Sequence, residues 1–187
     1  MQNDLFNSYE VPNGLLDEVY TTFPNSYTSY GQIKDLFYSL NPADFQKLNE
    51  YAKLSFLNQG ITYAVYDEDN GGTEKIFPFD LFPRVIHQQE WERLEEGLLQ
   101  RNKALNLFIG DVYGDQKILK DKVVPEELIF SSPHYVDLMK GFHPPGKIYT
   151  HICGTDLIRH TDGNFYVLED NLRNPSGVSY VLINRET

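Results

Sequence analysis

A stretch of alternating residues around an Asp-Gly pair is the feature that most constrains the fold of this chain. In DLIRHTDGNFYVLEDN, residues 156–171, apolar and polar side chains alternate on both sides of Asp162 and Gly163. Alternation with a period of two is typical of a half-buried β-strand, and Asp-Gly is favoured in two-residue hairpin turns because it tolerates positive φ. The stretch therefore predicts an antiparallel hairpin whose turn is Asp162-Gly163.

The register of this hairpin would place two carboxylates opposite one another. With a two-residue turn, cross-strand partners have numbers that sum to a constant, so Asp156 lies opposite Glu169. The same rule pairs Arg159 with Tyr166. Opposite residues share one face, with β-carbons about 4.5–5.5 Å apart, and like charges at that spacing are destabilising. Asn171 projects from the same face because it lies two residues beyond Glu169.

This face of the predicted hairpin has the chemistry of a cation site. The carboxylates of Asp156 and Glu169 and the amide oxygen of Asn171 are hard oxygen ligands, which suit Mg²⁺ or Mn²⁺ better than zinc. A bound cation would turn the repulsion between the carboxylates into a binding site. The alternative is a solvent-facing hairpin edge whose acidic residues prevent aggregation, and the register alone leaves both interpretations open.

The N-terminal third of the chain predicts an irregular arm followed by helices. Residues 1–30 are rich in Asn, Tyr, Ser and Pro, which favours an arm that lies on the rest of the protein. Residues 29–40 place apolar side chains at helical spacing behind Ser29, a candidate N-cap. A second helix follows between Asn41, its predicted N-cap, and Gly60, its predicted stop.

The rest of the chain predicts strands on either side of one long helix. Alternation around EDNGG indicates a hairpin over residues 61–77, and an amphipathic helix follows over about residues 89–112. Strand-like sequence returns from Lys147 onward. Helices first and antiparallel hairpins later predict the α+β fold class. We expect residues 1–60 to pack on an α+β part, residues 61–187, as one structural unit.

The composition excludes several kinds of partner and site. The 187 residues carry 16 Lys and Arg against 27 Asp and Glu, a formal charge of -11, so we expect neither nucleic acid nor an anionic membrane surface as a partner. Cys153 is the single cysteine, which excludes an intramolecular disulfide and a cysteine-rich zinc site. The sequence shows neither a signal-peptide pattern nor an apolar run of about 18 residues. We therefore expect a cytoplasmic protein.

The spacing of the hairpin residues resembles that of a known enzyme family. An Asp, twelve residues, a Glu, any residue and an Asn, with Asp-Gly at the tip, is similar to the magnesium-binding strand pair of ATP-grasp ligases such as D-alanine:D-alanine ligase. Longer stretches resemble the bacterial circularly permuted ATP-grasp proteins, from about Gly60 to the C-terminus. These stretches are FPFDLFPRVI, EWERLEEGLLQRNKALNLFIGDVYG and GTDLIRHTDGNFYVLEDNLRNPSGVSYVLINR.

The resemblance implies a fold, a reaction and a set of metal ligands. It implies an α+β fold that grips ATP between two subdomains, and a ligase that joins a small-molecule carboxylate to an amine through an acyl phosphate. Carried over by position, Asp156, Glu169 and Asn171 would hold one or two Mg²⁺ or Mn²⁺ ions beside ATP. The oligomeric state does not follow from it.

Three further residues acquire roles from the same resemblance. Arg173 would share the metal face if the strand continued, and would contact a phosphate or the acyl phosphate; a surface ion pair is the alternative. Ser176 and Gly177 match the loop that follows the metal strand, where backbone N–H groups meet an anion. An ordinary Pro-Ser-Gly turn is the alternative for these two residues.

Two departures from the family pattern limit what this chain is expected to do alone. D-alanine ligase-type sequences place an arginine two residues before the first metal Asp, where this chain has Gly154, and Arg159 falls on the opposite face of the predicted register. The lysine-bearing strands and glycine-rich lid that hold ATP are also missing, so we expect an N-terminal fragment of a longer protein, inactive by itself.

Other interpretations remain open at this point. A catalytically degenerate ATP-grasp-like binding or scaffold module is the main alternative, and a hydrolase with Asp156 and Glu169 as its acid and base is a weaker one. Gln100, Arg101 and Asn106 recur in the family on the long helix, where roles in helix packing and in substrate contact are both open.

Overall fold

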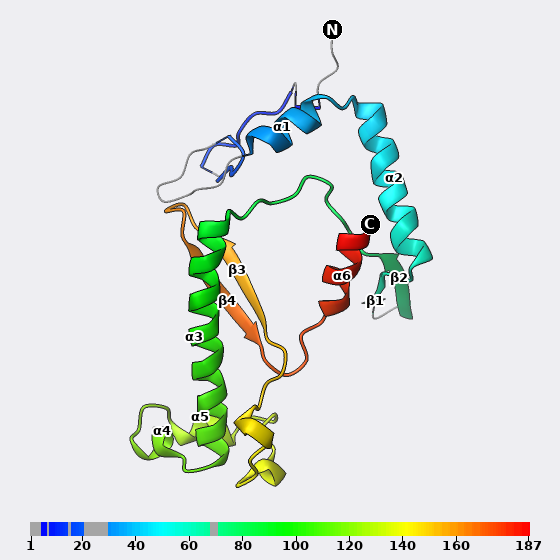
Figure 1. Ribbon diagram of the computed structural model, residues 1–187. Helices are drawn as coiled ribbons and strands as arrows, with labels where there is room; N and C mark the ends of the chain where they lie inside the picture. Colours follow the sequence, from blue (N-terminus) through cyan, green and yellow to red (C-terminus); the bar gives the residue numbers. More distant parts are fainter. Residues whose placement is uncertain (1–4, 7, 15, 21–29, 68–70) are drawn as a thin grey trace. The chain divides into compact units, whose positions relative to one another are not determined.

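The computed structural model describes residues 5–6, 8–14, 16–20, 30–67 and 71–187 (Figure 1). They form the predicted α+β fold, with helices and two antiparallel two-stranded sheets. The chain divides into two compact units, which are described separately. The first comprises Met1–Glu90, His160–Asn164 and Gly177–Thr187, and the second comprises Trp91–Arg159 and Phe165–Ser176. Much of the predicted N-terminal arm, and the candidate N-cap Ser29, lie outside the described residues.

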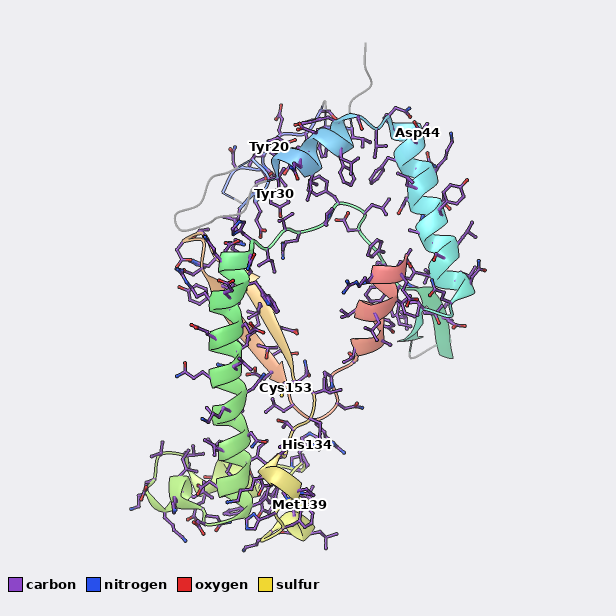
Figure 2. All side chains as sticks on the ribbon, in the orientation of Figure 1. Tyr20, Tyr30, Asp44, His134, Met139 and Cys153 are labelled. Carbon is purple, nitrogen blue, oxygen red and sulfur yellow. The ribbon has the colours of Figure 1, made fainter. Side chains whose placement is uncertain are left out.

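The first unit contains several helices, and a side-chain cap marks the start of one of them. They are α1 (Gly31–Tyr38), α2 (Pro42–Asn58) and α6 (Val178–Glu186). The side chain of Asn41 accepts a hydrogen bond from the backbone N–H of Asp44 at 2.9 Å, at the end of α2 where Figure 2 labels Asp44. The predicted N-cap of this helix is therefore confirmed.

The second predicted hairpin is also present in this unit. Strands β1 (Thr62–Asp67) and β2 (Gly71–Ile76) pair antiparallel. The turn that joins them, residues 68–70, lies outside the described residues.

Aromatic side chains form the core beside this hairpin. Phe56 of α2 is fully buried, and its ring centroid lies 5.3 Å from that of Phe79. Phe77, which follows β2, packs on Tyr180 of α6 at 4.4 Å between centroids, and the Tyr180 hydroxyl donates to the backbone oxygen of Thr62. These contacts attach α2 and α6 to the β1–β2 hairpin through apolar burial and ring packing.

The long helix α3 (Gln88–Tyr113) confirms the predicted amphipathic helix. From Trp91 onward it belongs to the second unit. Its apolar stripe is half-buried along most of its length and buried at Val112, whereas Trp91 stays exposed. Short helices follow it: α4 (Lys117–Lys120), α5 (Glu126–Phe130) and the 3₁₀ helices η1 (Asp137–Met139) and η2 (Pro145–Lys147).

The predicted hairpin of residues 156–171 is formed by β3 (Gly154–Arg159) and β4 (Phe165–Asn171), but its turn differs from the prediction. The loop holds three residues, 161–163. It is closed by hydrogen bonds from His160 N to Asn164 O and from Gly163 N to His160 O, both 2.9 Å long. Gly163 alone in this loop has positive φ, +83°, as in a type I turn followed by a left-handed glycine. The prediction of a two-residue turn was therefore wrong.

A β-bulge restores the register that the longer loop displaces. Next to the turn Arg159 lies opposite Phe165, one residue away from the predicted Tyr166. The register then shifts between Asp156 and Leu157, where β4 carries one extra residue, Leu168. Beyond the bulge Asp156 lies opposite Glu169, as predicted. Two deviations of one residue each thus cancel, and the pairing of the two carboxylates is confirmed.

Replacing Gly163 with Ala tests the geometry of the loop. A β-carbon at φ +83° costs about 1–2 kcal/mol, so Gly163→Ala should lower the free energy of unfolding in a urea titration. Gly97→Ala is the control, because nothing lies within 4 Å of a β-carbon added at Gly97 in α3; it should leave stability unchanged or raise it by roughly 0.5–1 kcal/mol. Equal effects of the two variants would contradict the three-residue loop.

Candidate functional site

The β3–β4 hairpin has one exposed face and one covered face. One face, which we call the open face, carries three cross-strand pairs: Gly154 with Asn171, Asp156 with Glu169, and Ile158 with Tyr166. All of these residues except Gly154 are exposed. The opposite face, the helix face, carries three pairs that are half-buried or buried: Thr155 and Asp170, Leu157 and Val167, Arg159 and Phe165. The predicted faces of Asp156, Glu169, Asn171 and Arg159 are therefore observed, whereas Tyr166, predicted opposite Arg159, lies on the open face opposite Ile158.

The three predicted metal ligands share the open face. Asp156 lies opposite Glu169, and the amide nitrogen of Asn171 donates a hydrogen bond to Glu169 Oε1 at 3.1 Å. The Asn171 amide therefore lies beside the Glu169 carboxylate, with its nitrogen directed at that carboxylate.

This donor set fits a hard divalent cation. Among the described residues, no three His, Cys, Asp or Glu side chains cluster in a way that would hold a metal ion, so the candidate set is two carboxylates and one amide. Magnesium is usually bound by one or two carboxylates that it shares with substrate phosphates, and it keeps water in its remaining positions. An exposed face with three oxygen donors meets that requirement. The metal role itself stays a prediction.

The chain leaves the strand conformation before Arg173, the residue that a continued β4 would have placed on the open face. The strand ends at Asn171, and Arg173 lies at an exposed bend, so the continued strand that would align Arg173 with the open face is absent. Ser176 is exposed in the following turn. Gly177, with φ +81°, precedes α6 and belongs to the first unit. The phosphate roles of these residues stay predictions.

Gly154 allows the loop after β4 to return over the open face. A β-carbon added at Gly154 would lie 2.9 Å from Cβ of Pro175 and 3.6 Å from Cβ of Asn171. Such a contact is too short for any side chain, so an arginine at this position would displace the loop. The departure from the family pattern at Gly154 therefore has a steric reason in this chain.

Arg159 takes no part in the open face. It is 8% exposed on the helix face, where its guanidinium carbon lies 4.2 Å from the centroid of the Phe165 ring. This contact is a cation–π interaction. The expected position of Arg159 on the face opposite to the predicted metal ligands is confirmed.

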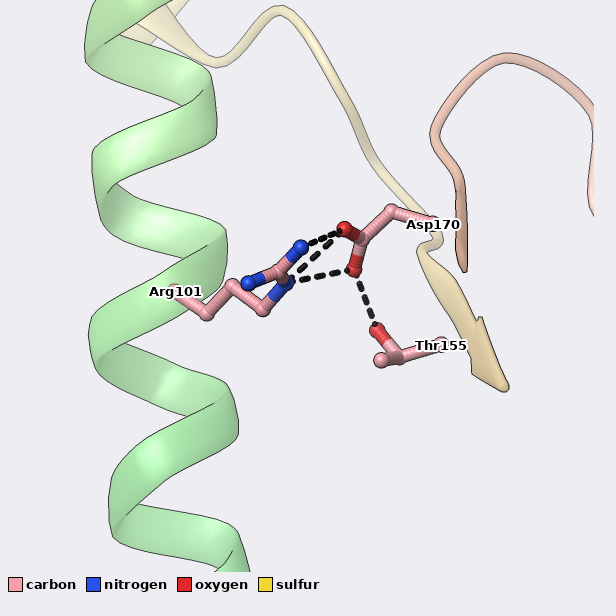
Figure 3. A network of polar contacts seen from close by, with 3 residues as sticks. All are labelled: Arg101, Thr155 and Asp170. Carbon is pink, nitrogen blue, oxygen red and sulfur yellow. Dashed lines mark hydrogen bonds and ion pairs between the residues drawn. The ribbon is translucent and has the colours of Figure 1, made fainter. Parts of the chain in front are cut away.

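Arg101 of α3, whose role the sequence had left open, forms an ion pair with Asp170 of β4. Arg101 Nε donates to Asp170 Oδ1 at 3.0 Å and to Oδ2 at 2.8 Å, and Nη2 donates to Oδ2 at 2.6 Å (Figure 3). Thr155 Oγ1 donates to Asp170 Oδ1 at 3.0 Å. One carboxylate thus receives donors from a helix and from the neighbouring strand.

The electrostatics of this contact keep Asp170 ionised. Hydrogen bonding from the Arg101 guanidinium, and then from Thr155, holds the pKa of Asp170 below its ordinary value, although burial acts in the opposite direction. The same carboxylate raises the pKa of Arg101. Because the pKa of Asp170 is lower in the folded state, the contact stabilises the fold above the ordinary pKa of an aspartate. That stability is lost as the pH falls through the lowered value.

Asn106 holds the segment that leads into β3. Its amide nitrogen donates to the backbone oxygen of Lys147, and its amide oxygen accepts from the backbone N–H of Tyr149, both at 2.8 Å. Two α3 residues whose roles were undecided therefore contact the β3–β4 region: Arg101 binds the side chain of Asp170 in β4, and Asn106 binds the backbone before β3. Gln100 has no contact in the described structure that assigns it a role.

The chain matches a family model described as circularly permuted ATP-grasp type 2 over residues 83–187. An uncharacterized protein of Mycobacterium leprae is 43% identical over 185 residues, which cover 97% of this chain and 32% of that protein. An uncharacterized protein of Synechocystis is 42% identical over 178 residues, or 95% of this chain and 37% of that protein. A protein of Frankia alni named as a candidate glutamate–cysteine ligase 2-3 is 38% identical over 130 residues, or 68% of this chain and 14% of that protein.

The fold, the acidic hairpin and these matches define a protein of the ATP-grasp class. The chain belongs to the circularly permuted ATP-grasp family, type 2, and the resemblance noted from its sequence is confirmed. It spans about a third of the length of the first two relatives. No helix of the described residues combines the length and the apolar character needed to cross a bilayer.

Replacing Gly154 with Ala tests the close approach of Pro175. Alanine usually stabilises a strand relative to glycine, but here its β-carbon would meet the Pro175 ring at 2.9 Å. We expect Gly154→Ala to lower the free energy of unfolding by about 1–3 kcal/mol, the usual cost of overpacking. The double variant with Pro175→Gly removes the clashing carbon and should regain part of the loss in a double-mutant cycle. A stabilising Gly154→Ala would show that the loop does not lie there.

Proposed function

We propose that this chain supplies the magnesium-binding strands of an ATP-dependent carboxylate–amine ligase. The observation that carries the proposal is the open face itself: Asp156 lies opposite Glu169, and Asn171 is hydrogen-bonded to Glu169, in a chain of the ATP-grasp family. Residues 61–187 would form the α+β part that bears this site, within a longer protein that completes it.

The proposed reaction begins with ATP and a small-molecule carboxylate. The carboxylate oxygen attacks the γ-phosphorus, the bond to the β-phosphate oxygen breaks, and an acyl phosphate and ADP form. An amine then attacks the acyl carbon, phosphate leaves, and an amide forms with release of a proton. Phosphoryl transfer depends mainly on positioning and on neutralising charge on phosphate oxygens, which is the chemistry that Mg²⁺ or Mn²⁺ supplies when bound.

Within this scheme the residues of the open face have distinct tasks. Asp156, Glu169 and Asn171 provide the oxygen ligands, and the repulsion between the two carboxylates favours a cation between them. Arg173, exposed just beyond the strand, would contact a phosphate or the acyl phosphate. The backbone N–H groups of Ser176 and Gly177 would meet a phosphate oxygen.

The name of one relative supports the proposal that the reaction forms an amide bond. The Frankia alni protein is named as a candidate ligase of glutamate and cysteine, and such a ligase joins a carboxylate to an amine. That name supports the class of reaction proposed for this chain.

A second candidate is a catalytically degenerate binding or scaffold module. The steric exclusion of a side chain at Gly154 by Pro175 favours it, because ligases of the D-alanine ligase type carry an arginine at this place. The two candidates differ in whether the intact protein still binds nucleotide through a metal.

Substitutions of the metal ligands test the first candidate. In the protein expressed from its full open reading frame, Glu169→Gln and Asn171→Ala should each reduce ATP-dependent turnover, measured as ADP release with a mixture of carboxylates and amines, by at least about 100-fold. Circular dichroism should show an unchanged fold, because both side chains are exposed. Glu95→Gln, an exposed glutamate of α3, is the matched control and should be active. Normal turnover in both ligand variants would refute the proposal.

Metal-dependent nucleotide binding separates the two candidates. Isothermal titration of the same full-length protein with ATP should give binding with Mg²⁺ or Mn²⁺ and little binding after chelation by EDTA, because the carboxylates would then repel the phosphates. Binding that is absent in both conditions would favour the degenerate module.

A further inference from the structure

Asp170 stands between two of the proposed metal ligands and faces the other way. Glu169 and Asn171 project from the open face of β4, whereas Asp170 projects from the helix face and has a side chain only 9% exposed. Neighbouring strand residues alternate between faces, so whatever holds Asp170 also fixes the direction of Glu169 and Asn171.

The bulge makes this strand sensitive to slippage. If β4 had no bulge at Leu168, the register next to the turn would continue along the whole hairpin. Asp156 would then lie opposite Leu168, and Thr155 would lie opposite Glu169. A slip of one residue moves every following side chain to the other face. Glu169 would then leave the open face, and the proposed metal site would lose a carboxylate.

The contacts of Asp170 favour the bulged register. In that register Thr155 lies opposite Asp170 and its hydroxyl reaches the carboxylate at 3.0 Å. On the other side Arg101 of α3 donates through Nε and Nη2 to both carboxylate oxygens, at 2.6–3.0 Å. Charge-assisted, two-pronged pairs of this kind add geometric specificity as well as energy.

We propose that Arg101 is a positioning residue of the metal site: through Asp170 it holds the register of β4 beyond the bulge, and so presents Glu169 and Asn171 opposite Asp156. The inference rests on the proposed function and deepens it. Arg101 acts through the strand and is no ligand itself, because its donors are directed at Asp170 on the helix face (Figure 3). Lysine would replace it only in part, because an ammonium group lacks the planar fork that meets both oxygens.

The test measures binding of Mn²⁺ alone to the protein expressed from its full open reading frame, by electron paramagnetic resonance. Arg101→Gln should weaken Mn²⁺ binding by about 10-fold or more, the usual effect of removing a partner behind a metal ligand. Arg101→Lys should recover only part of that loss. Arg93→Gln, an exposed arginine of the same helix, is the matched control and should bind Mn²⁺ as the unmodified protein does.

A ligand and a positioning residue differ in how they respond to excess metal. High Mn²⁺ should saturate Arg101→Gln, whose ligands are intact, but it should not restore stoichiometric binding in Glu169→Gln. Thr155→Val, which keeps the shape of the side chain and removes one donor to Asp170, should weaken binding by a smaller factor. This variant provides the test if Arg101→Gln fails to fold.

The outcomes separate this inference from the function on which it rests. Loss of Mn²⁺ binding in Glu169→Gln together with unchanged affinity in folded Arg101→Gln and Thr155→Val would overturn the positioning role alone. Unchanged Mn²⁺ binding in Glu169→Gln would overturn the proposed metal site and the positioning role with it.

Discussion

The ion pair between Arg101 and Asp170 is the contact on which the candidate site depends. It joins the long helix α3 to β4 at the residue between Glu169 and Asn171. Two-stranded hairpins are marginally stable by themselves in water, and this one leaves its open face exposed. Burial of the helix face and the charged contact at Asp170 therefore have to fix both the position and the register of the strands. Asn106 adds a second attachment of α3, to the segment before β3.

Local chemistry predicted the hairpin, but the correct pairing of its carboxylates followed from two compensating deviations. Alternation and the Asp-Gly pair located the strands. A left-handed Gly163 in a three-residue loop moved the register by one residue, and the extra residue Leu168 moved it back. Neither deviation has a clear signal in the sequence, since loops of two and three residues both use Asp-Gly and since a bulge needs no special side chain here. The predicted pairing of Asp156 with Glu169 was therefore right only because the two deviations cancel.

Contacts between distant segments account for what the sequence did not predict. The partner of Asp170 is 69 residues away on α3. The helical pattern places Arg101 between Leu98 and Leu105 on the apolar stripe, but it does not show which residue pairs with it. The contact of Gly154 with Pro175 also joins separate segments. Alternation assigns Gly154 to a strand, but no side chain fits there because the loop after β4 places Pro175 against it. By contrast, the N-cap of α2 was predictable, because Asn41 acts within its own turn.

Exposure to solvent limits the repulsion between the two carboxylates that face each other across the hairpin. Asp156 and Glu169 both lie on the open face in contact with solvent, where water and salt screen the repulsion to a small value. The Asn171 amide donates to Glu169 and further offsets the repulsion. The same carboxylates would repel strongly if a nucleotide and a second segment of protein covered the face, because the dielectric constant would fall. Under the proposed function, closure of the site around ATP would therefore strengthen the requirement for a cation between the two carboxylates.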